Sequence, residues 1–485
     1  MNIPYRLFAL LLVLQTVLTA QALVDLLPER ARGGLFYQEA LKSSQPYAGT
    51  PGTATTPRMA PNTTVNYFEQ YIDHNATDRG TFRQRWWMDK GGWDGVRPRV
   101  MLYIHGESAA SSTPAGFAQQ YAYESHSLLL ALEHRFYGES LVGPLTDRSL
   151  LKYLSVENAM ADLKHFRDTM TAHFFPQLAS HEVDWYVVGG SYPGALAVWL
   201  KETYPDRFKA AWSSSGVVQS IFDFYQFDYH LLKVLPLSCS TALRTLFQHF
   251  SSQYEVEEDS VRQALQVPAY FTKEDMAWML VDGAAMAVQY GKKGLLCSNV
   301  VQSDGVSPVS LSEYATLLRL WWGSDFTSSC YYSTTCLSDP AYSSQWGASY
   351  AWVYQCCSQL AYWQVGYPNS LRLELLNSSY FIYQCRSAYG EEVFPDTYQF
   401  NARYGGAYPH TDHVVALQGS DDPWVPAGAA DRLDPQYPVS VATCDGCGHC
   451  GDLHTPSSSD HSSLVAQRAL IKKYLDTWLG VEHEQ

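Results

Sequence analysis

Short apolar segments alternate with polar turns along the first 217 residues of the chain. These segments have strand length and are rich in β-branched or aromatic residues. They predict strands at Val65–His74, Thr81–Met88, Arg99–Gly106, Ser127–Arg135, Asp184–Val188 and Phe208–Gly216. Between the fourth and fifth of these, apolar residues recur at helical spacing from Ser155 to about His173, and Ser155 is suited to cap that helix. Strands that alternate with helices predict a mostly parallel sheet, and therefore an α/β fold.

The pattern changes between residues 218 and 400, where helical periods replace the strands. Helices are predicted at Leu243–His249, Val261–Leu265, Glu274–Gln289, Leu311–Trp321 and Tyr350–Trp363. Seven of the ten cysteines lie in this region, so we predict a helical insertion stapled by disulfides. The sheet pattern resumes at Thr411–Gly419, and a last helix is predicted at Ser462–Leu479. Residues 65–217 and 401–485 are thus expected to form one domain around the insertion.

The N-terminus has the pattern of a secretory signal peptide. One charged residue precedes Leu7–Ala20, which is apolar and ends in small residues, so residues 1–22 are predicted to be removed. A signal anchor is the alternative, but this segment is shorter than the roughly 20 residues of a membrane span, and no later segment is long and apolar enough. Residues 23–64 are rich in Pro, Gly, Ser and Thr and are expected to be a loose extension or pro-segment.

Composition narrows the functional class. The chain has 485 residues, 46% of them hydrophobic and 17% charged, which is typical of a globular protein with a large domain or several domains. Its net charge of −15 makes nucleic acid an unfavourable partner. A secretory route predicts disulfides and glycans on the sequons at Asn62, Asn75 and Asn377. We therefore expect a secreted or lysosomal protein.

The strand that begins at Asp184 runs into Gly189, Gly190 and Ser191, and a helical pattern follows. A strand, a sharp turn with serine at its apex and a helix form a nucleophile elbow. Pro193 stands where the motif has its second glycine, although proline is tolerated in a first helical turn. The alternative is a glycine-rich turn whose serine only caps the helix.

A serine nucleophile needs a base and an acid, which in an α/β-hydrolase follow it in the order acid and then histidine. Asp421 and Asp422 both lie in the loop after the predicted strand Thr411–Gly419, and His449 and His454 come later. The backbone N–H of Tyr192 and a donor in the loop His105–Ser108, at Gly106, are the expected oxyanion hole.

Three rival interpretations share these residues. Cys444, Cys447, His449, Cys450 and His454 could bind zinc, but disulfides compete in an oxidising compartment, so we predict neither a metal nor another cofactor. The triad order is also compatible with an esterase or lipase. A catalytically inactive binding protein of the same fold is the third possibility, although such a protein would be expected to lack a triad residue.

Several motifs, spread over roughly residues 65–480, resemble one family. They are Gly-Gly-Ser-Tyr-Pro-Gly at Gly189–Gly194, Glu-His-Arg-Phe-Tyr-Gly-Glu-Ser at Glu133–Ser140, the segment Tyr153–Leu163, and Asp-Pro-Trp at Asp422–Trp424. They resemble the proline-specific serine carboxypeptidases, the family of lysosomal Pro-Xaa carboxypeptidase, dipeptidyl-peptidase II and thymus-specific serine protease. The resemblance implies an α/β-hydrolase fold with a helical cap inserted after the strand that follows the elbow. It also implies exopeptidase action on peptides next to proline, and a homodimer is compatible with the fold.

The resemblance assigns roles to individual residues. It implies Ser191 as nucleophile, Asp422 rather than Asp421 as acid, and His449 as base. Glu107 matches the acid of the family's loop and could bind a substrate amine, the alternative being a salt bridge or a loop hydrogen bond. Trp424 could line a proline pocket or pack in the core. His105 and Ser108 depart from the family's pattern because they replace glycines, and so does Pro193.

Overall fold

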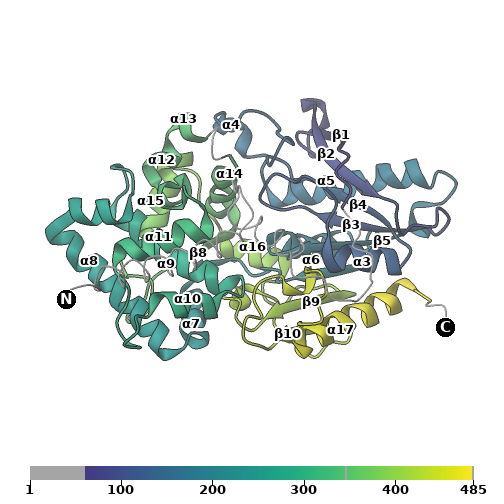
Figure 1. Ribbon diagram of the computed structural model, residues 1–485. Coiled ribbons are helices and arrows are strands. Elements are labelled where there is room, and N and C mark those ends of the chain that lie inside the picture. Colours follow the sequence, from purple (N-terminus) through teal and green to yellow (C-terminus); the bar gives the residue numbers. More distant parts are fainter. Residues whose placement is uncertain (1–60, 344–346, 483–485) are drawn as a thin grey trace, which may run out of the picture.

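The computed structural model describes residues 61–343 and 347–482, and Figure 1 shows them in two lobes. One lobe contains the sheet and the other is mostly helical. The predicted signal peptide and nearly all of the predicted extension lie outside the described residues.

An eight-stranded sheet runs in the order β1-β2-β4-β3-β5-β6-β9-β10. Its strands are β1 (Asn66–Tyr71), β2 (Thr81–Asp89), β3 (Arg99–Ile104), β4 (Leu128–Leu132), β5 (Asp184–Gly190), β6 (Ala210–Ser214), β9 (Val414–Gly419) and β10 (Val439–Ala442). The pairs β1–β2 and β2–β4 are antiparallel, and the others are parallel. Central strands such as β3 and β4 are buried along their whole length, as expected where helices cover both faces.

Alternate residues of each central strand pack on opposite faces of the sheet. Val100 and Leu102 of β3 belong to the core cluster that contains the helices α5 (Val156–Phe174) and α6 (Tyr192–Thr203). Met101 belongs to a second cluster with α3 (Gly116–Glu124) and α17 (Ser462–Leu479). The sheet is therefore sandwiched between two helical layers. Ser155 caps α5 by accepting the Asn158 N–H at 3.2 Å, as predicted.

The helical lobe comes from the chain between β6 and β9 (Figure 1). Its helices are α7 (Tyr225–Val234), α8 (Leu237–Leu265), α9 (Lys273–Gln289), α10 (Lys293–Val300), α11 (Leu311–Trp322), α12 (Thr334–Ser338), α13 (Pro340–Ser343), α14 (Gly347–Gln355), α15 (Ser378–Tyr389) and α16 (Thr397–Tyr404), and the sheet lobe adds the short α4 (Arg148–Leu151). Disulfides join Cys239 to Cys297, Cys330 to Cys336, and Cys357 to Cys385. The region is thus rich in helices and in disulfides, as predicted.

One helix prediction in this lobe was wrong at its C-terminal end, and two other predicted helical segments lie in one long element. The predicted helix Tyr350–Trp363 ends as α14 at Gln355 and continues as a π-helical turn, Cys356–Leu360. The next three residues form β8 (Ala361–Trp363), which pairs with β7 (Ile221–Asp223), so tertiary pairing overrides the helical pattern. The segments predicted at residues 243–249 and 261–265 belong to the single element α8, which is kinked at Glu257.

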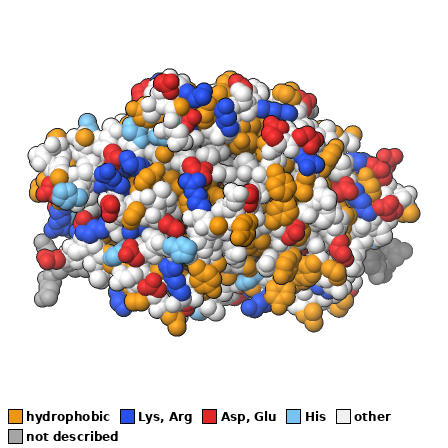
Figure 2. Space-filling view, turned by 180° about the vertical axis from the view of Figure 1, so that it is seen from behind, with side chains coloured by type: hydrophobic (Ala, Val, Ile, Leu, Met, Phe, Trp, Pro, Cys, Tyr) orange, Lys and Arg blue, Asp and Glu red, His pale blue; other side chains and the backbone are white. Residues whose placement is uncertain are grey.

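The surface carries charges of both signs, and two of the three sequons are exposed. Figure 2 shows acidic and basic side chains interspersed over one face. Asn75 and Asn377 are exposed, whereas the Nδ2 of Asn62 donates to the carbonyl oxygen of Met88 at 2.6 Å. Within the described part of the chain, no helix combines the length and apolarity needed to cross a membrane.

Candidate active site

Ser191 lies at the turn between β5 and α6 with φ 63° and ψ −128°, a conformation that is strained for a residue with a side chain. The turn leaves no room beside it. A Cβ atom on Gly189 would lie 2.2 Å from the carbonyl oxygen of Pro193, and one on Gly190 would lie 3.0 Å from the Sγ of Cys450. Pro193 is in the first turn of α6, where it costs no hydrogen bond. The local structure is therefore a nucleophile elbow, with Ser191 half-buried at its apex.

Neighbouring serines of β6 hold the elbow in place. The N–H of Ser191 donates to the carbonyl oxygen of Ser214 at 2.9 Å, and the hydroxyl of Ser213 donates to the carbonyl oxygen of Gly194 at 2.9 Å. One loop further on, the backbone N–H of Cys450 donates to the hydroxyl of Ser215 at 2.9 Å. The same strand end thus ties the elbow to the loop that carries His449.

Asp422 and His449 meet beside this elbow. The Nδ1 of His449 lies 2.6 Å from the Oδ2 of Asp422, and both side chains are buried. The N–H of Trp424 donates to the other carboxylate oxygen of Asp422 at 3.0 Å, which fixes the carboxylate. Because the Nδ1–H of His449 donates to the Asp422 carboxylate, the Nε2 of the neutral ring is left as a proton acceptor. That Nε2 is buried and has no hydrogen-bond partner in residues 61–343 and 347–482.

Asp421 and His454 do not share this arrangement. Asp421 forms an ion pair with Lys293 at 2.9 Å, and its Oδ2 also accepts the N–H of Gly446 at 2.8 Å. His454 lies beyond the base loop near Arg468, and burial together with that guanidinium lowers its pKa to about 4. Asp421 therefore supports the loop, and only Asp422 reaches His449.

One disulfide and two backbone hydrogen bonds hold the loop that carries His449. A disulfide between Cys444 and Cys447 closes its first turn, and the carbonyl oxygen of Cys447 accepts the N–H of Asp421 at 2.9 Å. From the helical lobe, the carbonyl oxygen of Gln289 accepts the N–H of His449 at 2.7 Å. The disulfide removes two ligands from the zinc alternative, and the described residues contain no group that could hold a metal ion.

Opposing effects act on the pKa of His449, the candidate base. Burial lowers the pKa of His449, but the Asp422 carboxylate and the Cys450 sulfur outweigh burial and raise that pKa well above its usual range. The carboxylate thus stabilises the imidazolium that forms when the ring accepts a proton. Cys450 is a free, buried cysteine, and it lies directly after the base in the sequence.

The loop after β3 faces the elbow. Within the described residues, the N–H of Gly106 has no acceptor, and the N–H of Tyr192 belongs to the first turn of α6, where helical N–H groups lack intrahelical partners. The Nε2 of His105 lies 2.9 Å from the carbonyl oxygen of Ser112, and burial lowers the pKa of His105 to about 4, so the ring is neutral. Two N–H groups are thus available at the end of β3 and at the elbow.

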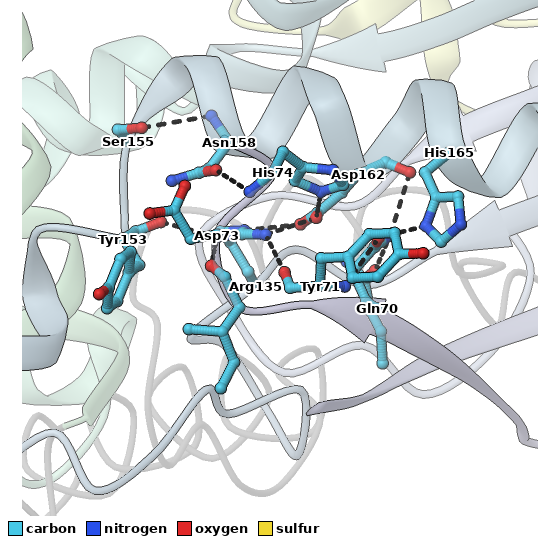
Figure 3. A network of polar contacts seen from close by, with 12 residues as sticks. Gln70, Tyr71, Asp73, His74, Arg135, Tyr153, Ser155, Asn158, Asp162 and His165 are labelled. Atoms are coloured by element: carbon cyan, nitrogen blue, oxygen red, sulfur yellow. Dashed lines mark hydrogen bonds and ion pairs between the residues drawn. The ribbon is translucent and has the colours of Figure 1, made fainter. Parts of the chain in front are cut away.

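A buried polar network joins the segments after β1 and β4 to α5 and contains residues of two of the sequence motifs (Figure 3). The Nε of Arg135 donates to Asp162 at 2.7 Å, and His74 lies 2.7 Å from the same carboxylate. Burial opposes ionisation of Asp162, but Arg135 and His74 outweigh it and lower the pKa of Asp162. Next to Arg135, the Nε2 of His134 lies 3.1 Å from the hydroxyl of Tyr192. The motifs around Glu133 and Tyr153 are therefore structural supports of the elbow.

A small aromatic cavity of about 30 Å³ lies between the acid loop and the helical lobe. Trp424 lines it, and the indole N–H of Trp424 donates to the Oε1 of Gln289 at 2.9 Å. The other aromatic lining residues come from separate elements of the inserted region: Trp278, Tyr331, Trp352, Tyr362, Trp363 and Phe381. Sequence reasoning did not identify these residues, because the only signal was the aromatic richness of the chain.

Comparison with known proteins identifies the family. The family model "Serine carboxypeptidase S28" matches residues 70–471. The chain belongs to the serine carboxypeptidase S28 family. Its sheet order and its serine elbow are those of an α/β-hydrolase fold. Among solved structures, the chain is similar to a probable hydrolytic enzyme from Pseudomonas aeruginosa over 85% of this chain and 95% of that one, at 12% identity and a TM-score of 0.35.

Named relatives of this S28 protein are serine proteases. A probable serine protease, EDA2, of Arabidopsis thaliana is 26% identical over 441 residues, which cover 85% of this chain and 88% of the relative. The thymus-specific serine protease of Mus musculus is 28% identical over 456 residues, covering 85% and 87%. A probable extracellular serine carboxypeptidase of Arthroderma benhamiae is 23% identical over 421 residues, covering 75% and 58%. The chain is therefore a serine-type peptidase by family.

Proposed function

We propose that this S28 protein is a serine exopeptidase that cleaves peptides next to proline through an acyl-enzyme on Ser191. The observation that carries the proposal is the buried contact of 2.6 Å between Asp422 and His449, beside a strained serine elbow. A buried histidine oriented by a carboxylate, with its Nε2 unoccupied, is the arrangement that activates a serine hydroxyl.

The mechanism follows from these positions. The Nε2 of His449 takes the proton of the Ser191 hydroxyl while the Oγ of Ser191 attacks the peptide carbonyl carbon. Asp422 holds the ring in the required tautomer and stabilises its charged form. His449 then gives the proton to the leaving amine, which leaves an ester on Ser191, and water repeats the sequence in reverse. The N–H groups of Tyr192 and Gly106 stabilise the negative oxygen of each tetrahedral intermediate.

The aromatic cavity supports a preference for proline. Trp424 is two residues from Asp422, so a cavity lined by its indole lies beside the triad. A pyrrolidine ring is compact and apolar, and aromatic faces bury such a ring efficiently. The inserted lobe supplies every lining residue of the cavity except Trp424, and it would also restrict access to chain ends. The four disulfides fit a protein made on the secretory route.

The test combines active-site labelling with product analysis. We expect a fluorophosphonate to label Ser191 in the wild-type protein and not in Ser191→Ala. Mass spectrometry of products from a peptide library should show cuts beside proline and near one end of each peptide, and Ser191→Ala should abolish them. Hydrolysis of simple esters without any peptide cleavage would contradict the proposal, and so would full peptidase activity of Ser191→Ala.

A further inference from the structure

Gln289 ends helix α9 of the inserted lobe and contacts both of the loops that carry the acid and the base. The last carbonyl groups of a helix lack intrahelical partners, and that of Gln289 accepts the N–H of His449 at 2.7 Å. Its side chain serves the other loop, where its Oε1 accepts the indole N–H of Trp424 at 2.9 Å. Gln289 is only 3% exposed, so little water can compete for these two bonds.

These contacts close a ring of four hydrogen bonds. The N–H of Trp424 donates to the Oδ1 of Asp422 at 3.0 Å, and the Oδ2 of Asp422 lies 2.6 Å from the Nδ1 of His449. From His449 the ring passes through Gln289 and returns to the indole of Trp424. Three members of this ring come from the chain after β9, and Gln289 comes from the inserted lobe. The position of the base therefore depends on the inserted lobe.

The backbones approach closely where α9 meets the base loop. A Cβ atom on Gly448 would lie 2.3 Å from the carbonyl oxygen of Gln289, and one on Gly291 would lie 2.6 Å from the carbonyl oxygen of Gly446. Glycines on both sides of the contact thus let the end of α9 touch the base loop directly. A side chain on Gly448 would displace the carbonyl group that holds His449.

An ion-pair cluster fastens the two lobes beside this ring. The Nζ of Lys293, the first residue of α10, lies 2.9 Å from the Oδ2 of Asp421 and 2.9 Å from the Oδ1 of Asp445. Lys293 and the backbone contact therefore dock the inserted lobe without the side chain of Gln289. The specific contribution of that side chain is its link to Trp424.

Trp424 is the member of the ring that also lines the aromatic cavity. Its indole packs against Phe227 and Tyr362 of the inserted lobe, with ring centroids 5.2 and 5.7 Å away. A ring bound in the cavity would pack on this indole and restrain it. Because the indole N–H bonds to Gln289, whose carbonyl group holds His449, one residue connects that restraint to the base.

We propose that Gln289 is a positioning residue for His449, and that through its bond with Trp424 a proline ring in the cavity raises kcat. The inference rests on the proposed function, because it takes His449 as the base for Ser191 and the cavity as the site of the proline ring. Contacts that form equally in the ground state and the transition state lower KM only, whereas a better-placed base lowers the barrier of the chemical step. The preference for proline over alanine should therefore appear in kcat.

Two substitutions remove the same hydrogen bond from opposite sides. Gln289→Met keeps the length of the side chain and the backbone carbonyl group but removes the acceptor, and Trp424→Phe keeps an aromatic wall but removes the donor. We expect kcat for a proline substrate to fall about 10-fold in either variant, the net worth of one hydrogen bond. An alanine substrate leaves the cavity unfilled, so its kcat should fall much less. Gln289→Met should have no further effect on kcat in the Trp424→Phe background.

The measurement is steady-state kinetics of the full-length protein on substrates that differ only at the residue before the cut bond. Ala-Pro and Ala-Ala aminomethylcoumarin amides form one pair, and N-blocked peptides that end in Pro-Phe and Ala-Phe form the other. The pair that the wild type cleaves is used for all variants, and circular dichroism verifies their folding. If Gln289→Met does not fold, the ratio of the two kcat values in Trp424→Phe decides alone.

Gln119→Met is the matched control. Gln119 is also 3% exposed, and its Nε2 donates to the Oδ2 of Asp89 at 2.9 Å. Asp89 pairs with Leu129 at the start of β4, the edge of the sheet opposite to the triad. This variant should keep the wild-type kcat on both substrates.

Four results would overturn the inference while leaving the serine peptidase in place. They are a wild-type preference for proline that lies in KM alone, a wild-type kcat of Gln289→Met on the proline substrate, equal losses of kcat on both substrates, and an undiminished effect of Gln289→Met in the Trp424→Phe background. Absence of hydrolysis of all four substrates by the wild type would overturn the proposed function instead.

Discussion

The Sγ of Cys450 lies 3.6 Å from the carbonyl oxygen of Ser214, the same oxygen that accepts the N–H of Ser191. A cysteine next to the base is thus packed against the backbone that holds the nucleophile. Its left-handed conformation, with φ 56°, turns the chain sharply after His449. The free thiol therefore belongs to the catalytic geometry as well as to the core.

Cys450→Ser tests the electrostatic part of this relationship. The sulfur of Cys450 helps to raise the pKa of His449, and serine replaces that sulfur with a smaller hydroxyl group. A general base works only when it is unprotonated, so the rising limb of kcat/KM against pH marks that pKa. We expect the limb to move to lower pH in Cys450→Ser. A limb that stays in place, or that moves to higher pH, would contradict this role of the sulfur.

Asp422→Asn and Asp421→Asn form a matched pair of neighbouring substitutions. Asparagine at position 422 keeps the shape but cannot hold the Nδ1 proton of His449 in the same way, and we expect kcat to fall by about 10⁴. Asparagine at position 421 weakens the ion pair with Lys293 and leaves His449 with its carboxylate, so the loss should be much smaller. The measurement is kcat of both purified variants, with circular dichroism to verify folding. Equal losses would remove Asp422 as the orienting acid.

Part of this site could be predicted from short segments of sequence, and part depends on contacts between segments that are far apart in the chain. The elbow could be predicted because Gly189, Gly190 and Ser191 follow an apolar strand directly, and the motif is local. The choice between Asp421 and Asp422 could not be made from spacing alone, because it depends on Lys293, which comes from the inserted lobe. Pro423, which restricts the backbone of the residue before it, gave a first indication of Asp422, and the family resemblance made the choice.

The aromatic cavity could not be predicted for a similar reason. Its walls are residues from α9, α14, β8, α15 and the segments between them, which meet only when the inserted lobe packs on the acid loop. The edge strand β10 was also missed, since it has only four residues and its alternation is weak. The helical pattern predicts that α14 continues to Trp363. The helix ends earlier because pairing of β8 with β7 outweighs local propensity there.

The disulfide between Cys444 and Cys447 should matter more for activity than for stability. It closes a very small loop, so its effect on the unfolded chain is limited to about 2 kcal/mol or less. The same turn holds Asp421 through the carbonyl oxygen of Cys447 and leads directly to His449. We expect the double variant Cys444→Ser, Cys447→Ser to remain folded at 25 °C and to lose at least tenfold in kcat. Thermal unfolding shows whether the variant remains folded, and single-turnover kinetics measure its loss of catalytic rate.

The matching double variant at Cys330 and Cys336 is the control for that experiment. This disulfide also closes a short loop, with a sequence separation of 6, but it lies in the inserted lobe away from the base. Its removal should leave kcat near the wild-type value. A base-loop variant that keeps full kcat would show that the hydrogen bonds alone hold His449 in place.

Glu107→Gln should stabilise the protein against unfolding at neutral pH. In the folded state burial raises the pKa of Glu107 from 4.5 to about 7, so the folded protein binds a proton there more tightly than the unfolded chain does. The stability that this proton gives is fully present below pH 4.5 and is lost progressively as the pH rises to about 7. Glutamine is neutral throughout and avoids the loss. The variant should thus equal the wild type near pH 4.5 and gain at most about 3 kcal/mol above pH 7. Melting temperatures of both proteins across this range give the comparison, and a gap that is largest at acidic pH would contradict the conclusion that Glu107 is a buried carboxylate without an ion pair among the described residues.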